Sequence, residues 1–185
     1  MGKLEIICGP MFSGKSEELI RRIRRAEFAK LPIQVFKHQF DQRTTINHIH
    51  AHSGGAITAI PVIQAEDIEK HLHPATQVIG IDEVQFFEPD ITPYIARLIE
   101  KGKRIIAAGL DVDFRIQPFG CMPTLLAIAD EITKLSAVCL ICGSDARLTQ
   151  RLVNGLPAQK NDPLVLIGAQ ECYQARCRSC HEIAG

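Results

Sequence analysis

GPMFSGKS, residues Gly9 to Ser16, matches the phosphate-loop pattern G-x-x-x-x-G-K-[ST] in full. In this pattern the glycines let the backbone curl so that successive N–H groups point at phosphate oxygens, and the lysine reaches the outer phosphates. The loop follows a short strand candidate, Leu4 to Cys8, and precedes a helix candidate, Glu17 to Lys30. Strand, glycine loop and helix is the order that phosphate binding requires, so the stretch predicts a nucleotide-binding loop.

Short apolar runs continue along the chain and alternate with helix-like segments. They lie at residues 33–36, 56–62, 78–81 and 104–110, and residues 90–101 carry apolar side chains at helical spacing. Alternating strands and helices predict an α/β fold with a mostly parallel sheet and helices on its faces. The alternation ends near Leu135. We therefore expect a P-loop domain over residues 1–135 and a small metal-binding domain over residues 136–185.

The composition argues against several classes of protein. A chain of 185 residues, 46% of them hydrophobic, can bury a sizeable core. Its 21 basic and 21 acidic residues balance, so no overall charge attracts it to nucleic acid or to a membrane. No apolar run approaches the ~18 residues of a membrane span. We expect a cytoplasmic protein, and we interpret the arginines of residues 21–25 as a solvated or subunit-facing side of a helix.

Two adjacent carboxylates follow the apolar run at residues 78–81. Asp82 is expected at the carboxyl edge of the sheet beside the phosphate loop, where it would hold Mg²⁺ directly or through water. The sequence is compatible with two catalytic roles for Glu83. It would activate a water, as in ATPases, or take a proton from a bound hydroxyl, as in kinases.

The cysteines indicate a metal site. Seven is an odd number, and four of them form two C-x-x-C pairs, Cys139 with Cys142 and Cys177 with Cys180. Four thiolates suit tetrahedral Zn²⁺ with no open position, which is typical of a structural site. Unligated thiols, or His181 as the fourth ligand, are the alternatives. The remaining three cysteines are interpreted as packing residues: Cys8, Cys121 and Cys172.

The order of the motifs resembles type II thymidine kinases over residues 3–182. The phosphate loop is followed by Asp-Glu-Val-Gln-Phe-Phe at 82–87, Gly-Leu-Asp at 109–111, Pro-Phe-Gly at 118–120 and paired cysteines around Tyr173. The resemblance implies transfer of the γ-phosphate of ATP to the 5′-hydroxyl of thymidine, which gives dTMP in nucleotide salvage. It also implies a RecA-like domain, a zinc domain with a lasso loop over the nucleoside, a homotetramer, and feedback inhibition by dTTP.

The resemblance also implies residue roles. Glu83 would be the base that takes the proton from the 5′-hydroxyl. Ser16 and Asp82 would organise Mg²⁺, and Arg43, in a D-x-R element, would stabilise charge in the transition state. The residues implied to bind ATP and its phosphates are Gly9, Pro10, Met11, Phe12, Ser13, Gly14, Lys15, Ser16, Arg43, Asp82 and Gln85.

A larger set would enclose thymidine, with Met11 near the thymine methyl group. A tight apolar niche accepts that methyl group, and main-chain groups read the edge of the base. Taken without the resemblance, the phenylalanines of the set are ordinary core candidates and its tyrosine a half-buried aromatic residue. The implied nucleoside residues are Met11, Phe86, Leu110, Phe114, Phe119, Thr149, Leu164, Leu166, Ile167, Gly168 and Tyr173.

Two other functions compete with the kinase. A RecA-like ATPase acting on nucleic acid would use Glu83 to activate water, but such a motor usually has a basic track, and the neutral charge argues against one. A binding module whose zinc ribbon contacts DNA or a protein is the third class. The segment from Leu164 onward has few basic residues, which disfavours this class.

Overall fold

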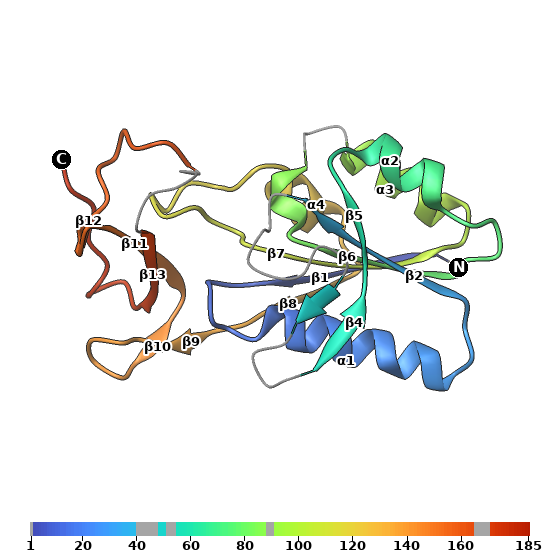
Figure 1. The fold of residues 1–185 in the computed structure, drawn as a ribbon, viewed down its shortest axis with the longest axis horizontal. Helices are drawn as coiled ribbons and strands as arrows, with labels where there is room; N and C mark the ends of the chain where they lie inside the picture. The colour runs from blue at the N-terminus through green and yellow to red at the C-terminus, as the bar shows by residue number, and fades with distance from the viewer. Residues whose placement is uncertain (1, 40–47, 51–54, 88–90, 165–170) are drawn as a thin grey trace.

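A parallel sheet forms the centre of the molecule in the computed structural model, which describes residues 2–39, 48–50, 55–87, 91–164 and 171–185 (Figure 1). The strand order is β5-β2-β6-β7-β1-β8, and every neighbouring pair runs parallel. This confirms the predicted α/β class. The strands are β1 (Lys3–Cys8), β2 (Ile33–His38), β5 (Ile60–Val62), β6 (Val78–Asp82), β7 (Arg104–Gly109) and β8 (Glu131–Lys134).

Helices cover both faces of this sheet (Figure 1). Helix α1 (Lys15–Phe28) lies on one face and buries Leu19, Ile20 and Ile23 at the predicted helical spacing. Three shorter helices lie on the other face: α2 (Ala65–His71), α3 (Ile91–Glu100) and α4 (Met122–Ile128). Because both faces are covered, the central strands are apolar along almost their whole length.

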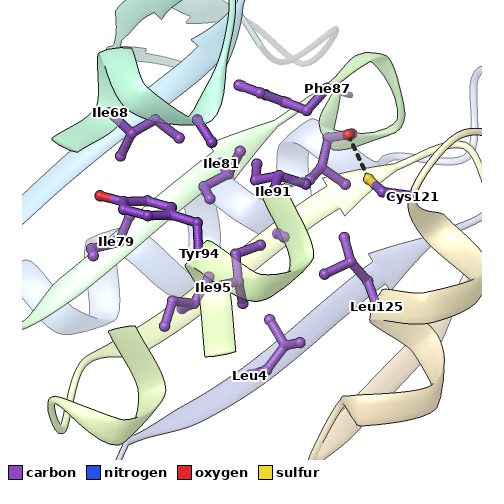
Figure 2. Packing of buried hydrophobic residues seen from close by; sticks show 14 of the residues in the cluster. Leu4, Ile68, Ile79, Ile81, Phe87, Ile91, Tyr94, Ile95, Cys121 and Leu125 are labelled. Carbon is purple, nitrogen blue, oxygen red and sulfur yellow. Dashed lines mark hydrogen bonds between the residues drawn. The ribbon is translucent and has the colours of Figure 1, made fainter. Parts of the chain in front are cut away.

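The core on the α2–α4 face joins the sheet to the helices (Figure 2). Ile79 and Ile81 of β6 pack with Ile91 and Ile95 of α3. A 3₁₀ turn, η1 (Val84–Phe86), follows β6 directly. The thiol of Cys121 donates a hydrogen bond to the carbonyl oxygen of Val84 in this turn, at 3.1 Å. The core therefore extends to the segment that carries the predicted catalytic carboxylate.

A buried carboxylate lies on the α1 face. Glu5 of β1 is ion-paired with Lys3, Arg22 and Arg104 at 2.6 to 2.8 Å. Burial alone would raise the pKa of Glu5, but hydrogen bonds from Arg104, Lys3 and Arg22 outweigh it and lower the pKa to about 2. The expectation of a solvated arginine side is wrong for Arg22, which is only 7% exposed.

The C-terminal strands lie beyond the carboxyl ends of the parallel strands (Figure 1). Strand β11 is the centre of an antiparallel sheet with order β12-β11-β13, and β9 pairs with β10. Among the described residues, no helix has both the length and the apolar character needed to cross a membrane. The strand bounds are β9 (Ala137–Val138), β10 (Asp145–Ala146), β11 (Leu148–Val153), β12 (Leu156–Pro157) and β13 (Glu171–Arg176).

Two segments differ from the sequence-based expectations. The single apolar run expected at residues 56–62 forms two strands, β4 (Ala56–Thr58), which pairs with β3 (His48–His50), and β5, which pairs with β2. Helix α4 and strand β8 were not predicted. Strand β8 is fixed beside β1 because the side chain and the N–H of Asp130 bond to the main chain of Leu4, at 2.8 and 2.9 Å.

Candidate active site

The phosphate loop connects β1 to α1 and is held by its own side chains. Gly14 has φ 83°, a left-handed conformation that glycine adopts without strain, and it directly precedes the first residue of α1. Lys15 Nζ donates to the carbonyl oxygen of Pro10 at 2.7 Å, and Ser13 Oγ donates to the same oxygen at 2.8 Å. The loop is thus in place, with its lysine folded back on its own backbone.

Asp82 lies in hydrogen-bond contact with Ser16, the last residue of this loop. Asp82 is the last residue of β6 and is buried, and Ser16 Oγ donates to its Oδ2 at 3.2 Å. A hydroxyl and a carboxylate at the carboxyl edge of the sheet are oxygen ligands of the type that Mg²⁺ prefers. Both residues were predicted for this purpose, and the structure brings them together.

Glu83 has an unusual backbone conformation for a non-glycine residue. Its φ of 52° is left-handed, and its N–H donates to Asp82 Oδ1 at 3.0 Å. The side-chain amide of Gln85 donates to Glu83 Oε2 at 2.5 Å. Gln85, which was predicted among the phosphate ligands, is buried here. Its side-chain oxygen Oε1 accepts a hydrogen bond from the N–H of Leu110 at 3.1 Å. Two consecutive carboxylates are therefore held at the end of β6, one facing Ser16 and the other facing Gln85.

Aromatic side chains lie close to these carboxylates. The rings of Phe86 and Phe119 meet edge to face with centroids 5.5 Å apart. His38, at the end of β2, packs against Phe86 at 5.8 Å and against Phe87 at 4.9 Å. Phe87 belongs to the core. His38 was not predicted to lie here, because its proximity to Phe86 depends on the pairing of β2 with β6.

Two guanidinium groups lie near the ring of Phe114. The Cζ atoms of Arg115 and Arg151 are 5.3 and 5.1 Å from its ring centroid, which is cation–π geometry. Arg151 of β11 is fully buried and donates through Nη1 to the carbonyl oxygen of Pro163. It lies opposite Tyr173 in the register of β11 with β13. Arg151 was missed, since an arginine inside an alternating strand pattern reads as solvent-facing.

A hydrogen bond joins the phosphate loop to the C-terminal sheet. The N–H of Met11 donates to Thr149 Oγ1 at 3.0 Å, and Thr149 is buried on β11. The carbonyl oxygen of Thr149 lies 3.3 Å from Nε2 of His181. Met11 and Thr149 were both predicted to contact the nucleoside, which stays a prediction, and the structure shows that they contact each other.

Four cysteine sulfur atoms gather at the base of the C-terminal strands. Cys139, Cys142, Cys177 and Cys180 have their Sγ atoms all within 4.8 Å of one another. Backbone N–H groups, led by that of Cys177, lower the pKa of Cys139 to about 6, whereas the nearby sulfur atoms of Cys177 and Cys142 raise that of Cys180 to about 12. Crowded thiols of this kind lose their protons together only when a cation compensates the charge.

This donor set fits structural Zn²⁺. The described group contains only the four cysteines, and His181 instead faces Thr149. Of the three other cysteines, Cys8 and Cys121 are buried, as expected for packing residues. The packing interpretation is wrong for Cys172, which is exposed on β13.

Comparison with known families agrees with this arrangement. A protein-family model described as thymidine kinase matches residues 2–181. The chain belongs to the thymidine kinase family. Membership implies a kinase that takes a nucleotide and thymidine as substrates, and it supports thymidine kinase function over the RecA-like ATPase.

The residues implied by the resemblance to thymidine kinases are spread unevenly over the structure. Four of them form two contacting pairs, Met11 with Thr149 and Phe86 with Phe119. Leu164 is 39% exposed. Four of the implied residues fall outside the described part of the chain: Arg43, Leu166, Ile167 and Gly168.

Proposed function

We propose that this thymidine kinase family member transfers the γ-phosphate of ATP to the 5′-hydroxyl of thymidine, giving ADP and dTMP. The observation that carries the proposal is the placement of Glu83 directly after Asp82, which pairs with Ser16 of the phosphate loop. One carboxylate is thus directed to the phosphate side, and the second lies three residues before Phe86, which packs against Phe119. A kinase needs this combination of a metal-side carboxylate and a base near the acceptor.

The phosphates would be bound by the loop of residues 9–16. Lys15 would exchange the carbonyl oxygen of Pro10 for the outer phosphates, a movement that needs only side-chain rotation. Ser16 and Asp82 would hold Mg²⁺, which neutralises charge on the transferring phosphoryl group when bound. Arg43 would add positive charge on the same group.

Thymidine would lie between the loop and the C-terminal strands. Glu83 would take the proton of the 5′-hydroxyl as its oxygen attacks the γ-phosphorus. Met11 would contact the base, since its backbone is fixed to Thr149. The other residues proposed to enclose the nucleoside are Phe86, Leu110, Phe114, Phe119, Leu164, Leu166, Ile167, Gly168 and Tyr173.

The remaining features of the proposal concern the whole protein. We keep the division into a P-loop domain, 1–135, and a zinc and lasso domain, 136–185, with Zn²⁺ as a structural ion. A cytoplasmic homotetramer inhibited by dTTP is part of the same proposal. Inhibition by dTTP is expected because that end product would occupy the nucleoside site and extend its phosphates toward the loop.

A nucleoside assay tests this function. The protein is incubated with ATP, Mg²⁺ and each nucleoside in turn, and nucleoside monophosphate is measured. We expect dTMP. ATP consumption without dTMP, stimulated by nucleic acid, would instead indicate the ATPase.

The Glu83→Gln variant tests the catalytic base. It should lose turnover by roughly 10²–10⁴-fold while its Kd for ATP stays unchanged, because the amide keeps the shape but cannot accept the proton. Glu100→Gln, at the exposed end of α3, is the matched control and should keep full activity. Wild-type turnover in Glu83→Gln would remove Glu83 from the mechanism.

A further inference from the structure

Gln85 is a buried amide whose two ends are both used. Its side chain is on the 3₁₀ turn η1, and the residue is only 2% exposed. At one end Nε2 donates to Glu83 Oε2 at 2.5 Å, and at the other end Oε1 accepts from the N–H of Leu110 at 3.1 Å. The side chain therefore spans from the proposed base to the residue that follows β7.

The orientation of this amide is fixed by its partners. A carboxylate only accepts hydrogen bonds and a backbone N–H only donates. Turning the amide over would set its oxygen against Glu83 and its NH₂ against the Leu110 N–H, and both hydrogen bonds would be lost. Such a loss in a buried place is costly, so one orientation is strongly preferred.

The space around Gln85 is as restricted as its bonding. A Cβ atom on Gly109 would lie 2.6 Å from Gln85 Oε1, so the end of β7 approaches the amide more closely than any other residue type permits. Gly120, with φ 50°, lies against the main chain, since a Cβ atom there would come within 2.1 Å of the Gln85 carbonyl oxygen. The turn is also held by the bond from Cys121 to Val84. These contacts leave Gln85 little freedom to turn toward a phosphate.

We propose that Gln85 is a positioning residue for Glu83. The proposal rests on the proposed role of Glu83 as the base. By donating to Oε2, the amide fixes the rotation of the carboxylate. In the transfer, the O5′–H bond breaks as an O–H bond to the Glu83 carboxylate forms, and the O5′–Pγ bond forms as the bond from Pγ to the β-phosphate oxygen breaks, releasing ADP.

The second hydrogen bond gives this arrangement a consequence for the acceptor. Leu110 belongs to the proposed wall of the nucleoside site, and its N–H is the group that Gln85 accepts from. The same side chain thereby sets the distance between the base and the nucleoside wall. Loss of Gln85 should reduce kcat and should leave ATP binding nearly unchanged.

Two substitutions test the contributions of the two hydrogen bonds of the Gln85 amide. Gln85→Glu keeps an acceptor for Leu110 but replaces the donor with a second carboxylate beside Glu83, and two carboxylates that share a site resist joint ionisation. We expect the acid limb of its kcat–pH profile to move to higher pH by about one unit or more. Gln85→Met keeps the volume and removes both bonds. It should lower kcat about tenfold or more with Kd for ATP within about twofold of wild type.

Gln34→Met is the matched control for losing a bonded glutamine. The Gln34 amide donates to the His71 carbonyl at 2.8 Å and accepts from the His73 N–H at 2.7 Å, near the amino end of β2, away from the loop. This variant should lose stability, as judged by its melting temperature, with an unchanged kcat–pH profile. A kcat–pH profile that moves in Gln85→Glu and a kcat that falls in Gln85→Met, both without change in Gln34→Met, support positioning over a general effect on folding.

Two results would overturn the inference. If Gln85→Met weakens ATP binding tenfold and the kcat–pH profile of Gln85→Glu does not move, Gln85 is a phosphate ligand. If neither variant changes turnover or profile, Gln85 positions nothing. Both results are distinct from failure of the proposed function, in which the wild-type protein forms no dTMP, and from failure of Glu83 as the base, in which Glu83→Gln keeps turnover whatever the Gln85 variants do.

Discussion

Gly120, in the segment after β7, packs directly against the main-chain carbonyl group of Gln85. We expect Gly120→Ala to lower the free energy of unfolding by about 2–4 kcal/mol, because the new Cβ atom meets the Gln85 carbonyl and the φ of 50° is left-handed. Gly102→Ala is the control. Its φ is 79°, and a Cβ atom there would meet nothing within 4 Å, so it should cost only about 1 kcal/mol. Denaturant unfolding measures both values, and equal losses would contradict the steric argument.

At the scale of single residues, the sequence predicts the role of a residue when that role depends on its neighbours in the sequence. The phosphate loop and the pair of Asp82 and Glu83 were recognisable because each motif is contiguous, and the structure brings Ser16 to Asp82 as expected. By contrast, the amide of Gln85 was predicted from the sequence to bind phosphate. Its contacts come from Leu110 and Gly120, and only the folded chain brings those residues to it.

At the scale of elements, the buried Glu5 joins β1 to α1 and β7. Glu5→Gln should lower the free energy of unfolding at neutral pH by about 3–5 kcal/mol, because Arg22 would keep its charge in a buried place after losing a partner. Glu131→Gln is the control, since Glu131 is about half exposed and its ion pair with Arg22 should contribute at most about 1 kcal/mol.

The same substitution predicts a pH dependence. The pKa of Glu5 is about 2 in the folded protein, against an ordinary value of 4.5, so its ionised form stabilises the fold above pH 4.5. This contribution is lost as the pH falls through about 2. The difference in unfolding free energy between wild type and Glu5→Gln should therefore shrink between pH 4.5 and pH 2. A difference that stays constant over that window would contradict the ionic explanation.

Periodicity locates elements better than it assigns their partners. The apolar run at 56–62 was found, but the structure divides it between the β3–β4 hairpin and the edge of the central sheet. Strand β8 was missed because it is short and partly exposed and is fixed by Asp130, whose partner Leu4 is 126 residues away. Neither outcome follows from the local pattern of apolar residues.

At the scale of the whole molecule, the hydrogen bond from Met11 to Thr149 connects the phosphate loop to the C-terminal strands. Thr149→Val should lower the free energy of unfolding by about 1–3 kcal/mol, because the Met11 N–H loses its acceptor. It should also raise KM for thymidine, since the loop and the nucleoside wall lose their common support. Thr149→Ser restores the acceptor and should recover both values. Equal behaviour of the two variants would mean that the hydroxyl is dispensable.

The zinc group also belongs to this scale. Freshly purified protein should contain about one Zn²⁺ per chain. Cys177→Ser should lower that content and destabilise the C-terminal strands, because a closed four-thiolate site contributes directly to folding. Cys172→Ser is the control, since Cys172 is exposed and lies outside the group. Metal analysis and thermal unfolding measure the two effects, and normal zinc content in Cys177→Ser would contradict the four-thiolate assignment.

The four-cysteine group and the Met11–Thr149 contact both join distant parts of the chain, but only the first could be predicted from the sequence. The four-cysteine group was predicted because each C-x-x-C spacing already sets a pair of ligands at the correct distance. The contact of Met11 with Thr149 spans 138 residues and has no local pattern. The charge of Arg151, fully buried against Phe114, was equally invisible, because strand alternation does not say which face another segment will cover.

The left-handed backbone of Glu83 has a practical consequence for engineering this protein. A non-glycine residue at φ 52° costs of order 1 kcal/mol or more, and glycine or asparagine would relieve most of that cost. A library selected only for heat resistance would therefore favour replacement of the very residue proposed to carry the reaction. Any thermostable version obtained in this way needs a parallel screen for turnover, with codon 83 held constant.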